Sequence, residues 1–160
     1  MDTSYRPAGY STLSPLLVVS PAREAIEFYA TVFGAHVVTR MEGPDGGVWH
    51  CELDLGTGRM TVMDPNAVFG AVANDPTSDN AAFSLAIYVP DVDATLALAE
   101  QHGARVREKA DDFAVTGDRF ASIQDPYGVR WTLMTRTTPR TDEEVQQNLD
   151  AWVESMRSES

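Results

Sequence analysis

The spacing of hydrophobic and polar residues predicts a strand, a helix and three more strands in the first half of the chain. Residues 12–19 are rich in apolar and β-branched residues, and residues 22–33 carry apolar side chains at helical spacing. Gly34 is typical of the position just after a helix end. Glycine-containing turns separate the three further strands, which gives this segment the order βαβββ. These strands are predicted over residues 37–41, 48–55 and 59–63.

The same order recurs in the second half. Val19 corresponds to Val89, an offset of 70 residues, and Gly34 corresponds to Gly103, an offset of 69. Several matches at nearly one offset, in the same order, indicate a duplicated unit. In the second copy, the helix is predicted over residues 92–102 and the strands over residues 83–89, 105–107, 119–124 and 129–136.

Two segments lie outside the repeats. Residues 64–80 are rich in Asn, Asp, Pro and Gly and are predicted to form an exposed loop. Thr141 and Glu144 form a capping box that begins a predicted helix over residues 142–156. Its apolar stripe consists of Val145, Leu149, Trp152, Val153 and Met156. The stripe packs either on the chain itself or on a partner chain, and both alternatives stay open. The chain is thus interpreted as a single domain with modules over about 10–66 and 82–136, a linker over 64–81 and a C-terminal helix over 141–157.

Composition limits the partners and the compartment. The chain has 24 acidic and 12 basic residues, a net charge of −12, which argues against binding to nucleic acid or to anionic membrane surfaces. The apolar run at 15–19 is far shorter than the roughly 20 residues of a membrane span, and we find no signal-peptide pattern. Cys51 is the only cysteine, which excludes an intramolecular disulfide. We therefore expect a cytoplasmic protein without nucleic-acid or membrane partners.

The strand over 48–55 carries the strongest candidates for chemistry. Alternation along a strand places His50 and Glu52 on one face, together with Val48 and Asp54. The opposite, apolar face then contains Trp49, Cys51, Leu53 and Leu55. His50 and Glu52 could act as an acid–base pair in catalysis. A structural hydrogen bond, or a polar pair that orients a ligand, is the alternative.

Alternation along the other strands predicts a pocket with apolar walls and several hydroxyl groups. Its candidate ligand-binding residues are Ser14, Leu16, Ser84, Tyr88, Arg130 and Thr132. Arg130 could bind a carboxylate or phosphate, or it could pair with Glu52 or another acid. Asp118 and the adjacent Arg119 are predicted to form a local ion pair.

The tandem βαβββ units resemble the vicinal oxygen chelate superfamily. Two motifs support this resemblance: Ala25-Ile26-Glu27-Phe28-Tyr29 on the first helix and Asp125-Pro126-Tyr127-Gly128 in the last hairpin. That group includes glyoxalase I, bleomycin-resistance and fosfomycin-resistance proteins and extradiol dioxygenases. Gly43-Pro44-Asp45-Gly46, His50-Cys51-Glu52-Leu53 and Gly117-Asp118-Arg119-Phe120 look like its PhnB-like branch, also labelled 3-demethylubiquinone methyltransferase-like. The resemblance covers about residues 10–136.

The resemblance implies an α+β fold in which the two modules form a curved mixed sheet around a cavity, with a C-terminal helix added. It also implies a homodimer in which modules of both chains contribute. In metal-dependent members of the superfamily, four strand positions supply metal ligands. The corresponding residues here are Ser14, Glu52, Ser84 and Thr132. Only Glu52 is a strong ligand, and His50 beside it raises the set to two, so we expect no metal and no other cofactor.

Three functions remain open. The first is a metal-free protein that binds a small organic molecule in the cavity. The second is a lyase, isomerase or dioxygenase that uses a degenerate metal site or the His50 and Glu52 pair. The third is an interaction module with a vestigial cavity, in which the stripe of the C-terminal helix contacts a partner.

Overall fold

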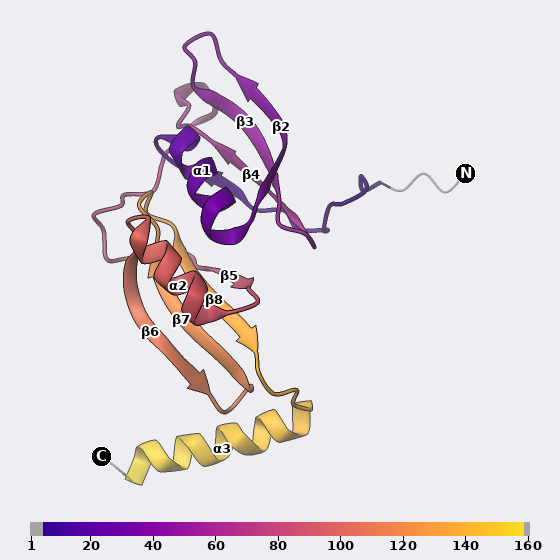
Figure 1. Ribbon diagram of the computed structural model, residues 1–160, viewed down its shortest axis with the longest axis vertical. Helices are drawn as coiled ribbons and strands as arrows, with labels where there is room; N and C mark the ends of the chain where they lie inside the picture. The colour runs from indigo at the N-terminus through magenta and orange to yellow at the C-terminus, as the bar shows by residue number, and fades with distance from the viewer. Residues whose placement is uncertain (1–4, 159–160) are drawn as a thin grey trace. The chain divides into compact units, whose positions relative to one another are not determined.

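The computed structural model describes residues 5–158 and divides into two compact units. Unit 1 contains the chain up to Asn80 together with Asp125–Val129, and unit 2 contains Ala81–Gln124 and the chain from Arg130 onward. Each unit has a four-stranded mixed sheet with one helix packed on it, and a third helix follows the last strand (Figure 1). The predicted α+β fold with two βαβββ modules and a C-terminal helix is confirmed.

The sheet of unit 1 has the strand order β1-β4-β3-β2, with β1 parallel to β4 and the other pairs antiparallel. Its elements are β1 (Leu16–Val18), α1 (Ala22–Phe33), β2 (His36–Glu42), β3 (Val48–Asp54) and β4 (Arg59–Met63). The apolar side of α1 covers one face of this sheet and forms the core of the unit. The fully buried core side chains include Ala25, Tyr29, Cys51, Leu53 and Val62. The other face of the sheet is left open for polar side chains.

Asp64, directly after β4, holds the start of α1 in place. Its Oδ1 accepts a hydrogen bond from the backbone N–H of Ala22 at 2.9 Å, and its Oδ2 accepts one from the N–H of Val48 at 2.7 Å. A carboxylate at a helix N-terminus is favourable because it satisfies free N–H groups and complements the helix dipole. This interaction replaces a local cap, since Pro21 at the N-cap position offers no side-chain hydrogen bond. Gly34, with φ of 67°, ends the helix as the sequence predicts.

A β-bulge in β3 changes which side chains are buried. Met41 pairs with His50 and Glu42 pairs with Val48, so Trp49 is an extra residue on β3. A bulge shifts the alternation of faces by one residue. Val48 is therefore buried, whereas Trp49 is 47% exposed. The prediction that Trp49 lies on the apolar face with Cys51, and Val48 on the face of His50, is wrong for this reason.

The turn between β7 and β8 belongs to unit 1 through contacts with α1. Asp125 is 2% exposed. Its Oδ1 accepts hydrogen bonds from the backbone N–H groups of Tyr127 at 3.0 Å and Val129 at 2.9 Å. Its Oδ2 accepts one from the Tyr29 hydroxyl at 2.8 Å, and the Tyr127 ring packs edge-on against Phe28 with centroids 6.2 Å apart. The Asp125–Gly128 motif of the sequence thus has a structural role.

Unit 2 repeats the arrangement, with the strand order β5-β8-β7-β6 and β5 parallel to β8. Its elements are β5 (Leu85–Tyr88), α2 (Val92–Gln101), β6 (Arg105–Phe113), β7 (Asp118–Gln124) and β8 (Arg130–Arg136). Strand β6 is longer than the predicted strand over 105–107 and contains two register shifts. The core of unit 2 includes Ala99, Ala121, Ile123, Trp131 and Leu133.

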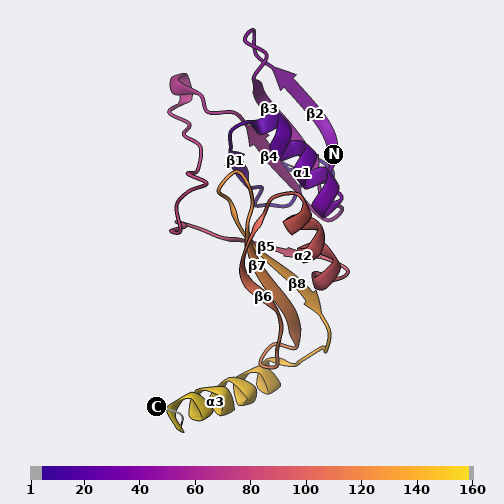
Figure 2. The ribbon, with the colours of Figure 1, turned by 60° about the vertical axis from the view of Figure 1, so that its left-hand side comes forward.

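Helix α3 (Asp142–Ser158) lies at the end of the unit 2 sheet where β6 turns into β7 (Figures 1 and 2). The predicted capping box is present, since the N–H of Thr141 donates to Glu144 Oε2 at 2.8 Å and the N–H of Glu144 donates to Thr141 Oγ1 at 3.2 Å. Trp152 packs edge-on against Phe113 with centroids 5.8 Å apart, yet Trp152 and Met156 are each 44% exposed. Part of the apolar stripe therefore packs on its own unit and part remains exposed.

The segment between β4 and β5 contains one short 3-10 helix (Ala67–Phe69). Val68 and Phe69 are 87% and 70% exposed. Across the described part of the chain, no helix has the length and apolar character needed to cross a bilayer.

Candidate functional site

Strands β3 and β4 place a polar cluster on the open face of the unit 1 sheet. His50 Nε2 lies 3.3 Å from Glu52 Oε1, and Arg59 Nη1 lies 3.9 Å from Glu52 Oε2. Arg59 also approaches Asp54, with Nε 3.6 Å from Oδ2. The sequence thus correctly places His50 beside Glu52, and it is Arg59 that adds an arginine to this pair.

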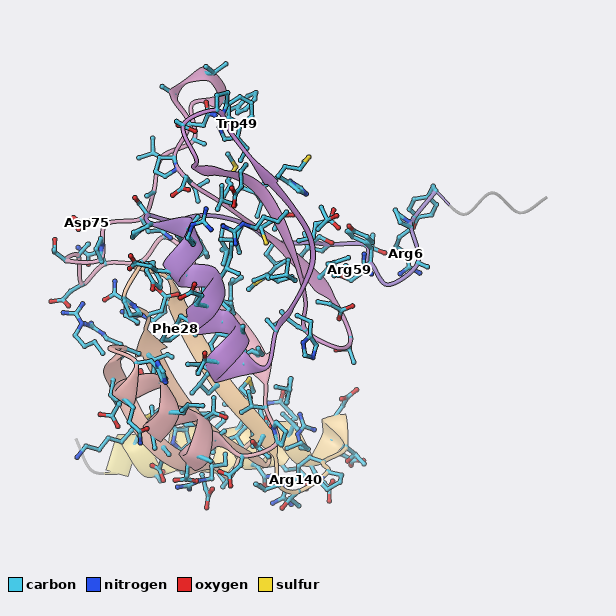
Figure 3. The ribbon with its side chains drawn as sticks, turned by 45° about the horizontal axis from the view of Figure 1, so that its top comes forward. Arg6, Phe28, Trp49, Arg59, Asp75 and Arg140 are labelled. Carbon is cyan, nitrogen blue, oxygen red and sulfur yellow. The ribbon has the colours of Figure 1, made fainter. Side chains whose placement is uncertain are left out.

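The N-terminal segment covers one side of this cluster. The guanidinium carbon of Arg59 lies 4.7 Å from the centre of the Tyr10 ring, and Figure 3 shows Arg59 beside the segment that carries Arg6. The pKa of Glu52 is lowered, and the largest cause is a hydrogen bond from Tyr10. The hydrogen bond and charge of His50 and the charge of Arg59 lower it further. An ionised carboxylate of low pKa is a weak base near neutral pH but a good hydrogen-bond acceptor. The arrangement therefore suits Glu52 as the anion that orients His50.

The other predicted residues of unit 1 lie on or beside the same open face. Leu16, which is 56% exposed, begins β1 and pairs with Thr61 on β4. Thr61 pairs in turn with Glu52 on β3, so Leu16 and Glu52 belong to one cross-strand row. Ser14 precedes β1 and is exposed.

The remaining predicted residues lie on or beside β5 and β8 of unit 2. Ser84 Oγ is 3.4 Å from Thr132 Oγ1 and 3.4 Å from the backbone oxygen of Arg130. The Tyr88 hydroxyl is 3.5 Å from Nη2 of Arg136. The structure therefore brings together Ser84, Thr132 and the backbone of Arg130, and it places Tyr88 further along β5.

A pocket of about 300 Å³ lies on the open face of the unit 2 sheet. Its lining residues are Phe113, Thr116, Asp118, Phe120, Thr132 and Met134. The rings of Phe113 and Phe120 meet at 78° with centroids 6.1 Å apart, which gives the pocket an aromatic wall. Met134 pairs with Phe120 across the strands and extends the apolar surface. Thr132 is the one predicted ligand-binding residue in this lining.

Asp118 is one of the lining residues, and the charge of its buried carboxylate is balanced by Arg136. Arg136 Nε lies 2.6 Å from Asp118 Oδ1, and Asp118 is 2% exposed. The predicted ion pair between Asp118 and Arg119 is wrong, because successive residues of a strand point to opposite faces. Arg119 instead pairs with Asp93 at 2.6 Å and with Asp112 at 3.0 Å. These hydrogen bonds raise the pKa of Arg119, and the one to Asp118 raises the pKa of Arg136.

Phe113 and Thr116 are two of the lining residues that the sequence did not predict. The predicted strand ended at residue 107, so both residues fell outside it. The missed signal is Gly117, whose φ is 75° and whose N–H donates to the oxygen of Phe113 at 2.9 Å. Interpreting residues 114–117 as a hairpin turn would have paired Phe113 with Asp118, as the structure does.

The four positions that the resemblance assigns to metal ligands do not form a strong donor set. They supply one carboxylate, from Glu52 in unit 1, and the hydroxyls of Ser14, Ser84 and Thr132. Among residues 5–158, no group of three or more His, Cys, Asp or Glu side chains is placed to hold a metal ion. Three strong ligands are needed for a competitive site of this kind. The side chains present therefore fit a polar binding surface better than a metal centre.

Comparison with known proteins identifies relatives of this chain. The model of the Glyoxalase/Bleomycin resistance protein/Dioxygenase superfamily matches residues 12–133. An uncharacterized protein of Mycobacterium tuberculosis H37Rv, Rv0887c, is 37% identical over 125 residues, which cover 76% of this chain and 72% of that protein. An uncharacterized protein of Mycobacterium bovis, Mb0911c, has the same identity and is covered over 80% of its length.

Solved structures share the fold at lower identity. A PhnB protein from Bacillus cereus has a TM-score of 0.60 at 20% identity, covering 78% of this chain and 99% of that one. TioX from Micromonospora sp. ML1 has a TM-score of 0.58 at 21% identity, covering 79% of this chain and 98% of that one. The fosfomycin resistance protein FosX from Listeria monocytogenes has a TM-score of 0.59 at 12% identity, covering 84% of this chain and 97% of that one.

Proposed function

Because the chain belongs to the glyoxalase/bleomycin resistance protein/dioxygenase superfamily, we propose that it binds a small, largely apolar organic molecule without a metal. The pocket on the unit 2 sheet carries this proposal. A concave site with apolar walls and few polar groups is the usual form of a small-molecule site, and such sites span roughly 300–1,000 Å³. At about 300 Å³, this pocket suits a molecule of one or two rings.

Charge favours a neutral ligand. The chain carries a net charge of −12, and the exposed surface of the pocket is apolar. A carboxylate or phosphate ligand would meet this negative potential, and the Arg136 guanidinium nearby is already paired with Asp118. An aromatic ligand, in contrast, gains contact with the edges and faces of Phe113 and Phe120.

The test uses naphthalene as a neutral two-ring probe, with binding measured by equilibrium dialysis. Phe120→Ala removes one aromatic wall, and the loss of this buried surface should weaken affinity about tenfold or more. Phe83→Ala is the matched control, because Phe83 lies just before β5, is 47% exposed and does not line the pocket. Absence of naphthalene binding to the wild-type protein, or equal affinity loss in both variants, would overturn the proposal.

A second candidate function is acid–base catalysis at His50, as in a lyase, isomerase or dioxygenase of the superfamily. The observation that favours it is the 3.3 Å separation between His50 Nε2 and Glu52 Oε1 on the open face of unit 1. Glu52 would hold the imidazole in one orientation, and His50 would move the proton. A screen for turnover of neutral α-hydroxyketones, and of catechols with dioxygen as the co-substrate, tests it. Turnover that persists in His50→Gln would contradict this role.

We also propose that the chain forms a homodimer. The sheets end in strands β1 and β2 in unit 1 and β5 and β6 in unit 2. Exposed sheet edges are normally paired or covered, and β2 has exposed apolar residues at Val37, Val38 and Met41. An interaction role for the exposed part of the α3 stripe is the third candidate, and it is supported by the exposure of Trp152 and Met156.

A further inference from the structure

We propose that Thr116 selects the ligand of the unit 2 pocket, and that this ligand is a flat, neutral molecule with a hydroxyl substituent, such as a phenol. This inference rests on the proposed binding function and names the ligand class within it. Thr116 lines the pocket beside the aromatic wall, and its Oγ1 is buried without a hydrogen-bond partner.

A buried hydroxyl without a partner destabilises the folded protein. Valine has nearly the same shape and would fill the position without that cost, so packing alone does not account for threonine here. A ligand oxygen in the pocket supplies the missing partner. A rotation about χ1 moves the hydroxyl from its buried position to another staggered position, and no hydrogen bond is lost when the hydroxyl turns toward the ligand.

The backbone around Thr116 is held firmly, which gives the hydroxyl a defined location. The N–H of Gly117 donates to the oxygen of Phe113 at 2.9 Å. The oxygen of Gly117 accepts from the N–H groups of Thr137 at 3.0 Å and Thr138 at 2.9 Å. The turn that carries Thr116 is thus fixed to both β6 and the segment after β8, and pre-positioned polar groups confer specificity.

The charges around the pocket favour a neutral hydroxyl over a charged group. The net charge of −12 disfavours anionic ligands. The Asp118 carboxylate is compensated by Arg136, so the pocket offers a cation no free anionic partner. Thr116 Oγ1 can either donate to or accept from a neutral hydroxyl. Phe113 and Phe120 provide the surface for the rest of the ring system.

The experiment compares naphthalene with 2-naphthol, which is neutral at pH 7 and differs by one hydroxyl. We expect the wild-type protein to bind 2-naphthol about three- to tenfold more tightly. Thr116→Val should abolish this preference, while Thr116→Ser should retain it. Thr31→Val is the control, since Thr31 is exposed on α1 in the other unit.

Thermal unfolding separates this role from a structural one. Thr116→Val should unfold at the same or a higher temperature without ligand, because it removes an unsatisfied hydroxyl. Equal affinity of the wild-type protein for both probes would overturn the role of Thr116 and leave the binding function intact. A preference for 2-naphthol that persists in Thr116→Val would also overturn the role of Thr116 and leave the binding function intact. Failure to bind either probe would overturn the binding function itself.

Discussion

Replacing Tyr29 by phenylalanine tests how the turn between β7 and β8 is held in unit 1. The Tyr29 hydroxyl donates a 2.8 Å hydrogen bond to Oδ2 of Asp125, and Tyr29 is fully buried. Burial and the neighbouring Asp125 raise the pKa of Tyr29 well above its usual value, so the hydroxyl remains protonated and donates over the working pH range. The substitution removes the donor and keeps the ring, which packs against Phe28 and Phe33 with centroids 5.7 and 6.0 Å apart.

The expected cost follows from the charge of the acceptor. A hydrogen bond to a charged group contributes about 1.5–3 kcal/mol to stability. For a chain of this size, that loss lowers the melting temperature by about 3–12 °C. Urea unfolding followed by circular dichroism should therefore give a midpoint shift without a change in slope.

Tyr127→Phe is the matched control for this measurement. Tyr127 also packs against Phe28, but the hydrogen bond described for it uses its backbone N–H. Its substitution should change the free energy of unfolding by less than about 0.5 kcal/mol. Equal destabilisation by the two variants, or no destabilisation by Tyr29→Phe, would refute the assignment of this hydrogen bond as the anchor of the turn.

Four other outcomes are expected. Wild-type protein should be more stable than Glu52→Gln at pH 7, because the lowered pKa of Glu52 makes its ionised form the stabilising one. In thermal melts the difference should begin to shrink as the pH falls below about 4.3 and should disappear below the lowered pKa of Glu52. Light scattering at micromolar concentration should give the mass of a dimer, and a monomer would contradict the proposal. Protein purified without chelator should contain far less than one equivalent of zinc, nickel or iron per chain, and a full equivalent would refute the metal-free assignment. Deleting residues 141–160 should weaken naphthalene binding less than Phe120→Ala does, since no α3 residue lines the pocket and Trp152 only packs behind Phe113.

Local sequence signals predicted the elements of the fold, because each depends on residues close together in the chain. Gly34 ends α1 with a positive φ, and Thr141 and Glu144 form their capping box. The pairing of His50 with Glu52 also follows from a spacing of two along a strand. The repeat supported the order of the elements along the chain, since the same order of strands and helix is predicted in both copies.

The features that the sequence could not supply depend on register between strands. The bulge at Trp49 arises from pairing between β2 and β3, which alternation along one strand does not contain. The partner of Asp118 is Arg136, 18 residues away on a neighbouring strand. The length of β6 depends on its pairing with β7. The sequence alone therefore did not predict Phe113 and Thr116 as pocket residues.

The turn at Asp125–Val129 makes the first unit of the protein depend on residues from the second half of the sequence. A recombination crossover near residue 80 would transfer α1 from one parent and the turn that packs on it from another. Tyr29 and Asp125 would then come from different sequences, although their hydrogen bond is buried. The two repeats are therefore unsuited to exchange as separate cassettes, and a working chimera must carry the helix and the turn from the same parent.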